Sequence, residues 1–549
     1  MVMASEDVEV EKKYDVGGEA EVPDLAVLPG VARVGEPRVD ALQAVYFDTE
    51  RHALAARGIT LRRRTGGADA GWHLKLPPEV SHEEEPASAP QRRRELHAPL
   101  GQPDVVPDSL LAHVLVYLRG DEPVPAVRLE TRRTTHALYA DDGVHLADLA
   151  DDRVTAHVLG STGPADEGAR TQEWREWELE LVHGSPDLFP AAGEVLASAG
   201  ARPAGHASKL AKALQGSEDA AAGPGSAVPG SAGTEGSGTG RGGTGGPRPA
   251  PEPPRKKGPV SDLLIAYLDA QISEILANDP GVRLEQPETV HDLRSATRRA
   301  RSALAAYRRL YSAATVRRLR DELKWLGGML GAPRDAEVML DRLRGQAAEL
   351  PPGPASKAAA DRLEEELGST LDTAYRKLQK MLLSERYFRL LDDLEAFRDH
   401  PPTRPAGQAT ARKAAGKLVG KAAKRLQRAA RTAKRARRGT QHETALHQVR
   451  KDAKRLRHVA ESVGPVHGKR ARKIVKAAHR QQKILGDFQD SVVARGVLAR
   501  LAAAPDLNQE VASAFVTLET RQVQLAAEAE AAYWKARKKS RTVLQRGVI

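Results

Sequence analysis

Acidic and basic side chains alternate with apolar ones at the start of the chain, where Glu9, Glu11 and Lys13 are interleaved with Val8 and Val10. In a β-strand, alternate residues lie on the same face. The pattern therefore predicts a strand with one charged face and one apolar face. Paired carboxylates bind hard divalent cations through oxygen, and Lys and Arg bind phosphate oxygens. The charged face has side chains for both kinds of contact.

The same alternation recurs along the first 215 residues. It groups Arg62 with Arg64, His73 with Lys75, Arg93 with Glu95, Asp148 with Asp152, and Glu176 with Glu178 and Glu180. One interpretation is an antiparallel sheet with a solvated face, which is common. The other is a sheet that curls until its charged faces line a shared interior. Such an interior would suit a metal–polyphosphate ligand, because neither set of buried charges is stable without partners.

The expected elements of this part are mostly short strands bounded by Gly and Pro. They are residues 8–16, 59–65, 72–77, 92–99, 128–140, 143–154 and 174–182, with helices at 107–118 and 189–199. The first part of the chain is therefore predicted to be an antiparallel α+β domain.

Charge divides the chain more sharply than its overall value of +11 indicates. Residues 1–215 carry 23 Lys and Arg against 36 Asp and Glu, a balance of −13, whereas residues 259–549 carry 56 against 33, a balance of +23. Between them, residues 216–258 are rich in Gly, Ser, Pro and Ala, and we expect a disordered linker there. A strongly basic domain implies an anionic partner.

After the linker, long Ala-, Leu- and Arg-rich segments with helical periodicity predict an all-helical domain, with breaks at 279–281, 351–354 and 401–402. This domain contains an internal repeat. His291, Arg294, Arg298 and Arg301 recur at the same spacing as His447, Arg450, Lys454 and Arg457. The segment LGAPRD (330–335) recurs as LGDFQD (485–490), at nearly the same distance from its histidine. We therefore predict two related helical bundles.

On a helix, each repeated set falls within an arc of about 80°, at about 100° per residue. The opposite faces are apolar, with Leu293, Ala300 and Leu304 in the first copy, and predict the bundle cores. A solvated face normally mixes charges of both signs, but these two stripes contain almost no acid. Their recurrence favours an anion-binding site over a solvated face.

A third basic feature is residues 401–442, which contain no Asp or Glu. Cations at every third or fourth position form a continuous edge on one helix; they are Lys413, Lys417, Lys421, Lys424, Arg428, Arg431, Arg435 and Arg438. The opposite side is mainly Ala, which makes a poor membrane-insertion face. Nucleic acid is a better rival, but aromatic residues make up only 4% of the chain and do not interleave with the cations. A flexible, dense polyanion fits the pattern better.

Composition excludes several classes of protein. The chain has no cysteine, which rules out disulfide scaffolds, thiolate metal sites and cysteine nucleophiles. No apolar run reaches the roughly 18 to 20 residues of a membrane span, and the acidic N-terminus does not resemble a signal peptide. We expect a cytoplasmic protein without membrane partners, and polyphosphate granules are a candidate location.

Glu9-x-Glu11-x-Lys13 resembles the ExExK signature of the CYTH family, the triphosphate tunnel metalloenzymes. The segments at 47–64, 72–77, 131–134, 146–154, 176–181 and 208–209 resemble later blocks of that family. The resemblance covers residues 5–215 and implies an eight-stranded antiparallel β-tunnel that binds triphosphate compounds with Mg²⁺ or Mn²⁺. Where the family often has an acid after its Arg-x-Glu block, this chain has His97.

The resemblance also implies roles for individual residues. Catalysis would involve Glu9, Glu11 and Lys13, and metal binding would involve Glu9, Glu11, Asp148, Glu178 and Glu180. The substrate phosphates would be bound by Lys13, Arg62, Arg64, Lys75, Arg93, Arg133 and Lys209. The implied reaction is metal-assisted hydrolysis, in which a carboxylate orients or deprotonates the attacking water.

The repeated H-x-x-R-x-x-x-[KR]-R-x-R and L-G-x-x-x-D strings resemble the CHAD family, the conserved-histidine helical domain. That resemblance covers roughly residues 259–540. The predicted domain spans 259–545, as repeats at about 259–400 and 404–545. The resemblance implies two pseudo-symmetric four-helix bundles that bind inorganic polyphosphate on a basic surface, through His291, Arg294, Arg298, Arg301, His447, Arg450, Lys454 and Arg457.

The expected function is hydrolysis of inorganic triphosphate, or a related compound, in the tunnel, with polyphosphate bound by the helical domain. Two other tunnel reactions share the same phosphate-and-metal wall: thiamine triphosphate hydrolysis and formation of cyclic AMP from ATP. A non-catalytic polyphosphate-binding or granule-associated protein is the alternative from a different class.

Overall fold

The computed structural model describes residues 5–77, 90–159, 170–215 and 252–546, which fall into two compact units on either side of residues 216–251. Most of the predicted linker, residues 216–251, lies outside the described residues. The domain boundaries at 215 and 259 therefore remain predictions.

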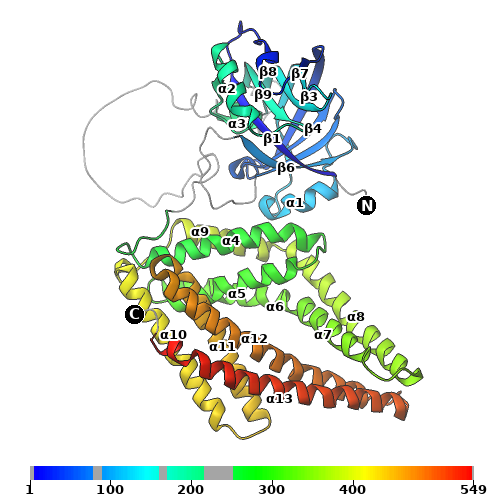
Figure 1. The fold of residues 1–549 in the computed structure, drawn as a ribbon, viewed down its shortest axis with the longest axis vertical. Helices are drawn as coiled ribbons and strands as arrows, with labels where there is room; N and C mark the ends of the chain where they lie inside the picture. The colour runs from blue at the N-terminus through cyan, green and yellow to red at the C-terminus, as the bar shows by residue number, and fades with distance from the viewer. Residues whose placement is uncertain (1–4, 78–89, 160–169, 216–251, 547–549) are drawn as a thin grey trace. The chain divides into compact units, whose positions relative to one another are not determined.

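Eight antiparallel strands close into a barrel in the first unit (Figure 1). They are β1 (Ser5–Asp15), β3 (Arg38–Asp48), β4 (Thr60–Thr65), β5 (Gly71–Leu76), β6 (Gln91–Ala98), β7 (Val124–Tyr139), β8 (His145–Val158) and β9 (Arg170–Leu181). Their order around the barrel is β1-β6-β5-β4-β3-β7-β8-β9, and pairing of β9 with β1 completes the circle. Two-residue strands β2 (Arg33–Val34) and β10 (Arg202–Pro203) pair with β7 and β1. The eight-stranded tunnel is confirmed. Of its strands, β3 was not among the segments expected from alternation.

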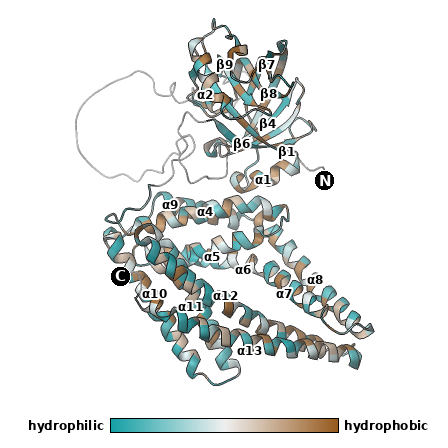
Figure 2. Ribbon diagram, viewed as in Figure 1, coloured by the Kyte–Doolittle hydropathy of each residue, from teal (hydrophilic) through white to brown (hydrophobic). Residues whose placement is uncertain are grey.

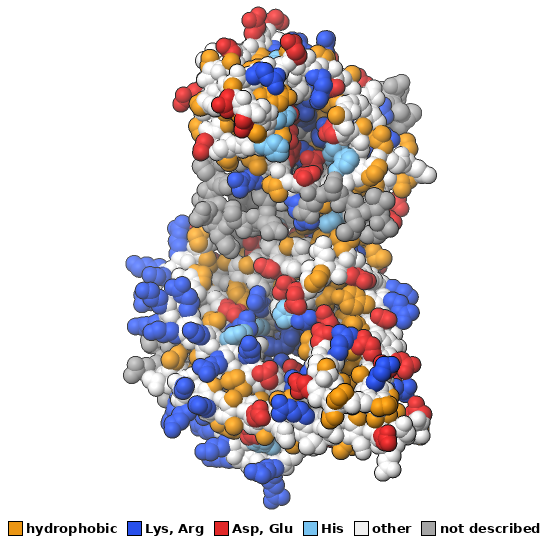
Figure 3. Space-filling model, turned by 45° about the vertical axis from the view of Figure 1, so that its right-hand side comes forward, with side chains coloured by type: hydrophobic (Ala, Val, Ile, Leu, Met, Phe, Trp, Pro, Cys, Tyr) orange, Lys and Arg blue, Asp and Glu red, His pale blue; other side chains and the backbone are white. Residues whose placement is uncertain are grey.

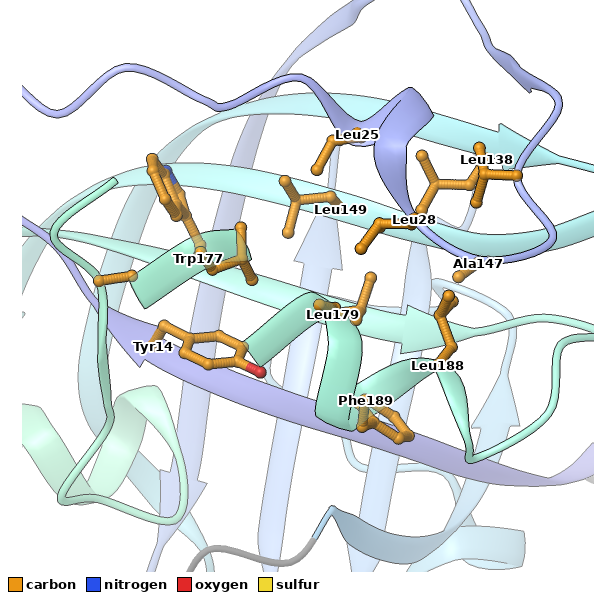
Figure 4. Packing of buried hydrophobic residues seen from close by; sticks show 14 residues of the cluster. Tyr14, Leu25, Leu28, Leu138, Ala147, Leu149, Trp177, Leu179, Leu188 and Phe189 are labelled. Atoms are coloured by element: carbon orange, nitrogen blue, oxygen red, sulfur yellow. The ribbon is translucent and has the colours of Figure 1, made fainter. Parts of the chain in front are cut away.

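The apolar faces of the strands point outward, because helices rather than solvent cover them. Trp177 and Leu179 of β9 pack with Leu188 and Phe189 of α2 (Leu188–Ser198), as Figure 4 shows. In the same way, the outward faces of β4 and β5 pack against α1 (Asp108–Leu118). Burial of these faces leaves the charged faces for the interior, as the second interpretation of the alternation predicts.

The short helix α3 (Lys209–Gln215) packs against the inner face of the barrel. Its Leu210 and Ala213 lie in one cluster with Leu129 of β7 and Ala156 of β8. Leu129 and Ala156 are directly opposite each other in the ladder and so share a face. The start of α3 therefore brings Lys209 into the barrel from outside the sheet.

Ten α-helices form the described part of the second unit. They are α4 (Ser261–Arg283), α5 (Thr289–Tyr307), α6 (Ala313–Met329), α7 (Gly331–Ala347), α8 (Pro354–Leu382), α9 (Glu385–Asp399), α10 (Ala411–Arg435), α11 (Thr440–Ser462), α12 (Gly464–Ala502) and α13 (Gln509–Arg546). Figure 2 shows hydrophobic and hydrophilic residues interleaved along them, as one-sided packing requires. None of the described helices is long and apolar enough to span a membrane.

The predicted break at residues 279–281 is wrong, because α4 continues through Pro280 to Arg283. The buried Asp279 carboxylate accepts hydrogen bonds from Arg283 Nε at 2.5 Å and from the Tyr387 hydroxyl at 2.8 Å. The bond from Tyr387 holds the last turn of α4 against α9. Pro280 removes one backbone N–H bond from the helix, and these side-chain contacts offset that loss.

The repeat is confirmed in the order of the helices. The stripe helix of each copy, α5 or α11, follows and packs on a preceding helix, α4 or α10. In the second copy α12, which kinks at Gly468 and then runs unbroken to Ala502, takes the place of α6 and α7, and α13 takes the place of α8. The copies also share a core, in which Leu343 and Leu363 of the first pack with Leu498 and Phe515 of the second.

Candidate functional site

A charged cavity occupies the inside of the barrel. Its lining contains six carboxylates and seven cationic side chains among the described residues: Glu9, Glu11, Asp69, Glu95, Glu178 and Glu180, with Lys13, Arg62, Arg64, Lys75, Arg93, Arg133 and Lys209. Tyr46, Thr60 and Ser208 complete it. All the tunnel residues predicted from the sequence, except Asp148, are thus brought together.

Carboxylates from β1 and β9 gather on one wall. Glu11 and Glu180 are directly opposite each other in the β1–β9 ladder, and Glu9 is one inward position away. Burial, together with the neighbouring Glu9 and Glu11, raises the pKa of Glu180 to about 7. Burial also opposes ionisation of Glu11, but the Lys13 and Lys75 ammonium groups outweigh it and lower its pKa. This wall holds more negative charge than the adjacent cations compensate.

Lysine side chains bridge these acids to the rest of the cavity. Lys75 Nζ lies 2.6 Å from Glu9 Oε2 and 3.7 Å from Glu95 Oε2. Lys13 Nζ lies 2.6 Å from Glu11 Oε2 and also pairs with Glu178. Because β1 alternates its charges, its two acids and its lysine all project inward.

A second cluster lies deeper, where α3 enters. Lys209 Nζ is 2.9 Å from Asp152, 2.7 Å from Glu176 and 2.7 Å from Glu178. Oxygen atoms of these three buried carboxylates lie within 4.8 Å of one another. Arg133 makes a bidentate contact with Asp152, at 2.8 and 2.6 Å. In this structure the cluster is neutralised by side chains of the chain itself.

Among the cavity cations, Arg62 bonds a phenol. Its Nη1 donates to the Tyr46 hydroxyl at 3.3 Å. Burial disfavours the phenolate of Tyr46, but the Arg62 charge outweighs it and lowers its pKa. Burial and the positive charges of Arg62 and Arg133 lower the pKa of Arg64 to about 9. Arg64 also pairs with Asp69, and an anion would relieve the repulsion among Arg62, Arg64 and Arg133.

Two predicted positions differ from the rest. Asp148 lies opposite Glu180 in the β8–β9 ladder, but it is half-exposed, bonds His145 Nε2 at 2.8 Å and is not among the cavity-lining residues. Asp152, four residues on, occupies the interior instead. His97 packs edge-on against the His73 ring at 4.8 Å and also lies outside the lining.

Sequence reasoning missed Tyr46, which directly precedes the segment 47–64 that resembles the CYTH family. Strand β3 was not expected from the sequence. Which of its side chains point into the barrel can be seen only from its pairing with β4. Tyr46 lies directly opposite Arg62 in the β3–β4 ladder.

The carboxylates of the β1–β9 wall fit a hard divalent cation. Glu9, Glu11 and Glu180 supply oxygen ligands only, as Mg²⁺ and Mn²⁺ prefer. Glu11 Oε1 is buried and has no hydrogen-bond partner among the described residues. A buried, unpaired carboxylate oxygen beside an acid with a raised pKa is the arrangement that a cation would stabilise.

In the helical unit, the two cationic stripes meet. α5 packs on α11, with the Tyr307 hydroxyl 2.9 Å from Ser462 Oγ. Burial and the nearby Arg294 and Arg450 guanidinium groups lower the pKa of Arg298 to about 10. Positive side chains of the two repeats therefore form one cluster, which the repeat by itself did not predict.

The L-G-x-x-x-D segment has a structural role in this cluster. A Cβ atom added at Gly331 would lie 3.4 Å from Arg294 Nη2, and one added at Gly486 would lie 3.4 Å from Arg450 Nη2. Arg294 Nη1 then donates to Asp335 Oδ1 at 2.9 Å. Each glycine therefore lies against a guanidinium, and in the first copy the acid four residues later orients that guanidinium.

The remaining stripe residues differ from one another in their neighbours and in their exposure. Arg457 bonds Glu461 Oε1 at 2.7 Å and His479 Nδ1 at 3.0 Å, and Arg301 lies near Arg320 of α6. His291 is exposed, whereas His447 and Lys454 are half-buried. The predicted apolar faces are confirmed: Leu293, Ala300 and Leu304 are buried, as are their counterparts in α11.

A buried histidine beside this cluster gives the helical unit a dependence on pH. Burial and the charges of Arg457, Arg299 and Arg298 lower the pKa of His458 to about 3. The unfolded chain binds a proton below about pH 6.5, so stability from the neutral ring is complete above that pH and is lost as pH falls toward 3. We expect the free energy of unfolding to fall by about 3 kcal/mol between pH 7 and pH 4 from this group.

Hydrogen exchange of the α11 amides at pH 7, 5 and 4, corrected for intrinsic rates, would measure this loss. H458Q should remove most of the dependence, because glutamine does not titrate. An equal loss of protection in H458Q and the parent protein would contradict the assignment.

Comparison with known proteins matches both units. A model of the CYTH domain matches residues 7–211, and a model of the CHAD domain matches residues 266–499. The uncharacterized proteins MT2285 and Rv2226 from two strains of Mycobacterium tuberculosis are each 36% identical over 531 residues, covering 94% of this chain and 93% of theirs.

Two solved structures are similar over about half of the chain. PptA from Streptomyces chartreusis is 22% identical, over 51% of this chain and 99% of that one, with a TM-score of 0.45. The CHAD domain from the plant Ricinus communis is 26% identical, over 51% of this chain and 93% of that one, with a TM-score of 0.41.

Proposed function

This chain belongs to the proteins that join a CYTH domain to a CHAD domain, and from that premise we propose a function for each unit. The barrel hydrolyses inorganic triphosphate, or a related triphosphate compound, with Mg²⁺ or Mn²⁺. The helical unit binds inorganic polyphosphate.

The observation that carries the first proposal is the interlocked pairing of charges inside the barrel. Lys75 is paired with Glu9, and Lys13 with Glu11 and Glu178. When the oxygens of a triphosphate bind these lysines, the carboxylates lose their ion-pair partners. Buried carboxylates without a cation are costly, so binding of the anion favours binding of a divalent metal beside it.

In this proposal the cations position the substrate. Arg62, Arg64 and Lys75 line the β4–β5 wall, and Arg133 and Lys209 face them from β7 and α3. Their donors bind the phosphate oxygens and stabilise negative charge as the P–O bond breaks. The metal held by Glu9, Glu11 and Glu180 would supply further charge neutralisation at the phosphate oxygens. A carboxylate of this wall accepts the proton of the attacking water.

The test offers purified full-length protein, with Mg²⁺ or Mn²⁺, four substrates in parallel: inorganic triphosphate, thiamine triphosphate, ATP and long-chain polyphosphate. Release of phosphate from triphosphate well above the other three supports the proposal. Preferred turnover of thiamine triphosphate, or formation of cyclic AMP from ATP, would replace it with that reaction. No turnover of any, with tight binding of long chains, would favour a non-catalytic polyphosphate-binding protein.

Tyr46 gives a prediction specific to this cavity. Y46F removes the hydroxyl that accepts from Arg62 but keeps the ring, so the guanidinium loses its orientation. We expect KM for the preferred triphosphate to rise about tenfold with little change in kcat, since one hydrogen bond to a charged group contributes about 1.5 kcal/mol. Steady-state kinetics would measure both constants. A fall in kcat at unchanged KM would instead place the Tyr46 hydroxyl in the transition state.

The second proposal rests on the meeting of the stripes. Arg294, Arg298 and Arg450 are crowded enough to lower the pKa of Arg298. Arg294 bonds Asp335, but the repulsion of Arg298 by Arg294 and Arg450 leaves the cluster with capacity for an anion. Polyphosphate is thin and densely charged, as a half-buried cationic cluster between two helices requires.

A further inference from the structure

Helix α10 carries a cationic surface that is separate from the stripes. Lys413, Lys417, Lys421, Lys424, Arg428, Arg431, Arg435 and Arg438, which follow one another along α10 and just beyond it, are all exposed. The apolar side of α10, with Val419 and Leu426, is buried in the bundle. These eight residues are called the α10 edge below.

The α10 edge lies on the far side of α11 from the stripe. Arg425 of α10 bonds Asp452 Oδ1 at 2.7 Å. At about 100° per residue, Asp452 lies about 180° around α11 from the centre of the stripe formed by His447, Arg450, Lys454 and Arg457. A ligand in the stripe therefore does not need the α10 edge.

The charge of α10 is also not required by the repeated fold. α4 occupies the same place in the first copy, and a bridge between Pro259 and Thr410 joins the segments that lead into the two helices. Yet α4 has four acids and one Arg, whereas α10 has ten Lys and Arg and no acid. Since the same fold forms with either charge, the charge of α10 points to a partner.

Helix α12 adds exposed cations near the start of α10. Near the start of α10, His467 of α12 bonds the Arg412 carbonyl oxygen at 3.0 Å. The first part of α12 then adds further exposed cations: Lys469, Arg470, Arg472, Lys473, Lys476, Arg480 and Lys483. No acid occurs between residues 462 and 486. Figure 3 shows Lys and Arg side chains gathered along the left margin of the helical unit.

The sequence pattern favours a flexible polyanion for this edge, but exposure of all eight residues along α10 and just beyond it changes that expectation. We propose that the α10 edge binds double-stranded nucleic acid through its phosphate backbone, without reading its sequence. From Lys413 to Arg435 the edge is about 33 Å long, at about 1.5 Å per residue, close to one turn of B-form DNA. It is exposed, so it can accept a wide cylinder, unlike the half-buried stripes. Helix α10 has no aromatic residue, which disfavours single strands that bind by base stacking but does not affect phosphate contacts.

The test measures binding of full-length protein to a fluorescent 30-base-pair DNA across a series of salt concentrations. The variant K417Q/K421Q/K424Q/R428Q removes four exposed charges from α10 and keeps good helix formers. We expect the slope of log affinity against log salt to shrink by about 3.6, and binding to weaken about a thousandfold near 100 mM salt. Two duplexes of unrelated sequence should bind alike.

Two matched variants each remove four charges elsewhere. R317Q/K324Q/K377Q/K380Q changes exposed positions on α6 and α8, and R294Q/R298Q/R450Q/K454Q changes the stripes. Both should keep duplex binding within a fewfold of the parent protein. Equal loss in either variant would overturn the proposal, by showing that overall charge or the stripes bind the duplex. So would absence of salt-dependent duplex binding by the parent protein, or tighter binding of a single strand.

Discussion

Replacing Glu9 and Glu11 together by glutamine is expected to lower metal-dependent phosphate release from the preferred triphosphate by roughly 10³-fold or more. Both carboxylates face the cavity, and each is paired with a lysine that binds the substrate in the proposed function. Glutamine keeps their size but removes the charge that would hold a cation. The defect should therefore appear in kcat.

Binding of the substrate should survive the same change. Without Glu9 and Glu11, the ammonium groups of Lys75 and Lys13 lose their closest competitors for phosphate. We expect triphosphate to bind E9Q/E11Q at least as tightly as the parent protein in the absence of metal, measured by calorimetry. Mg²⁺ should no longer raise the melting temperature of the barrel.

The matched control is E173Q, which removes an exposed carboxylate from β9, the strand that carries Glu178 and Glu180. Its turnover should be unchanged. Unchanged turnover in E9Q/E11Q would remove both residues from the reaction. Loss of triphosphate binding together with turnover would indicate a damaged cavity rather than a missing metal site.

The second large effect is expected in the helical unit, where R298Q/R450Q should weaken polyphosphate binding at least about 100-fold. Each guanidinium lost from a phosphate contact costs about 1.5 kcal/mol or more. The same variant should be more stable to heat than the parent protein. Arg298 and Arg450 repel each other in the free protein, and burial adds to the cost of the charge on Arg298.

A rise in melting temperature with a fall in affinity separates a binding site from a structural one. The control R317Q/K324Q removes two exposed cations from α6 and should change neither measurement much. Retained affinity in R298Q/R450Q would refute the stripe proposal. Loss of affinity with a lower melting temperature would make these arginines structural.

Much of the barrel could be predicted from residue alternation. Glu9, Glu11 and Lys13 share a face in any β-strand, and so do Arg62 and Arg64, because strand geometry has a period of two. The facing of Tyr46 could not be predicted, since β3 contains a longer apolar run and only its pairing with β4 shows that Tyr46 is opposite Arg62. Asp148 and Asp152 share a face by the same rule. Which of them reaches the centre depends on their depth along the barrel.

In the helical half, periodicity alone placed the cations of each repeat on one face and the apolar residues on the other. It could not show that α5 and α11 pack together, so the crowding of Arg298 with Arg450 came as a finding. The contacts of Gly331 with Arg294 and of Gly486 with Arg450 also appear only in three dimensions. Arg298 and Arg450 are 152 positions apart, and each glycine is 36 or 37 positions from its arginine.

The sequence by itself determined the local chemistry: which residues alternate, which recur, and which half is acidic or basic. These properties follow from the fixed periods of strands and helices, and they need no knowledge of neighbours. Only the tertiary structure decided which charges meet. Closure of β9 onto β1 placed Glu180 beside Glu11, entry of α3 brought Lys209 to Asp152, and the turn of α11 separated the stripe from the α10 edge. Each depends on long-range packing, because electrostatic interactions depend on distances that local periodicity does not contain.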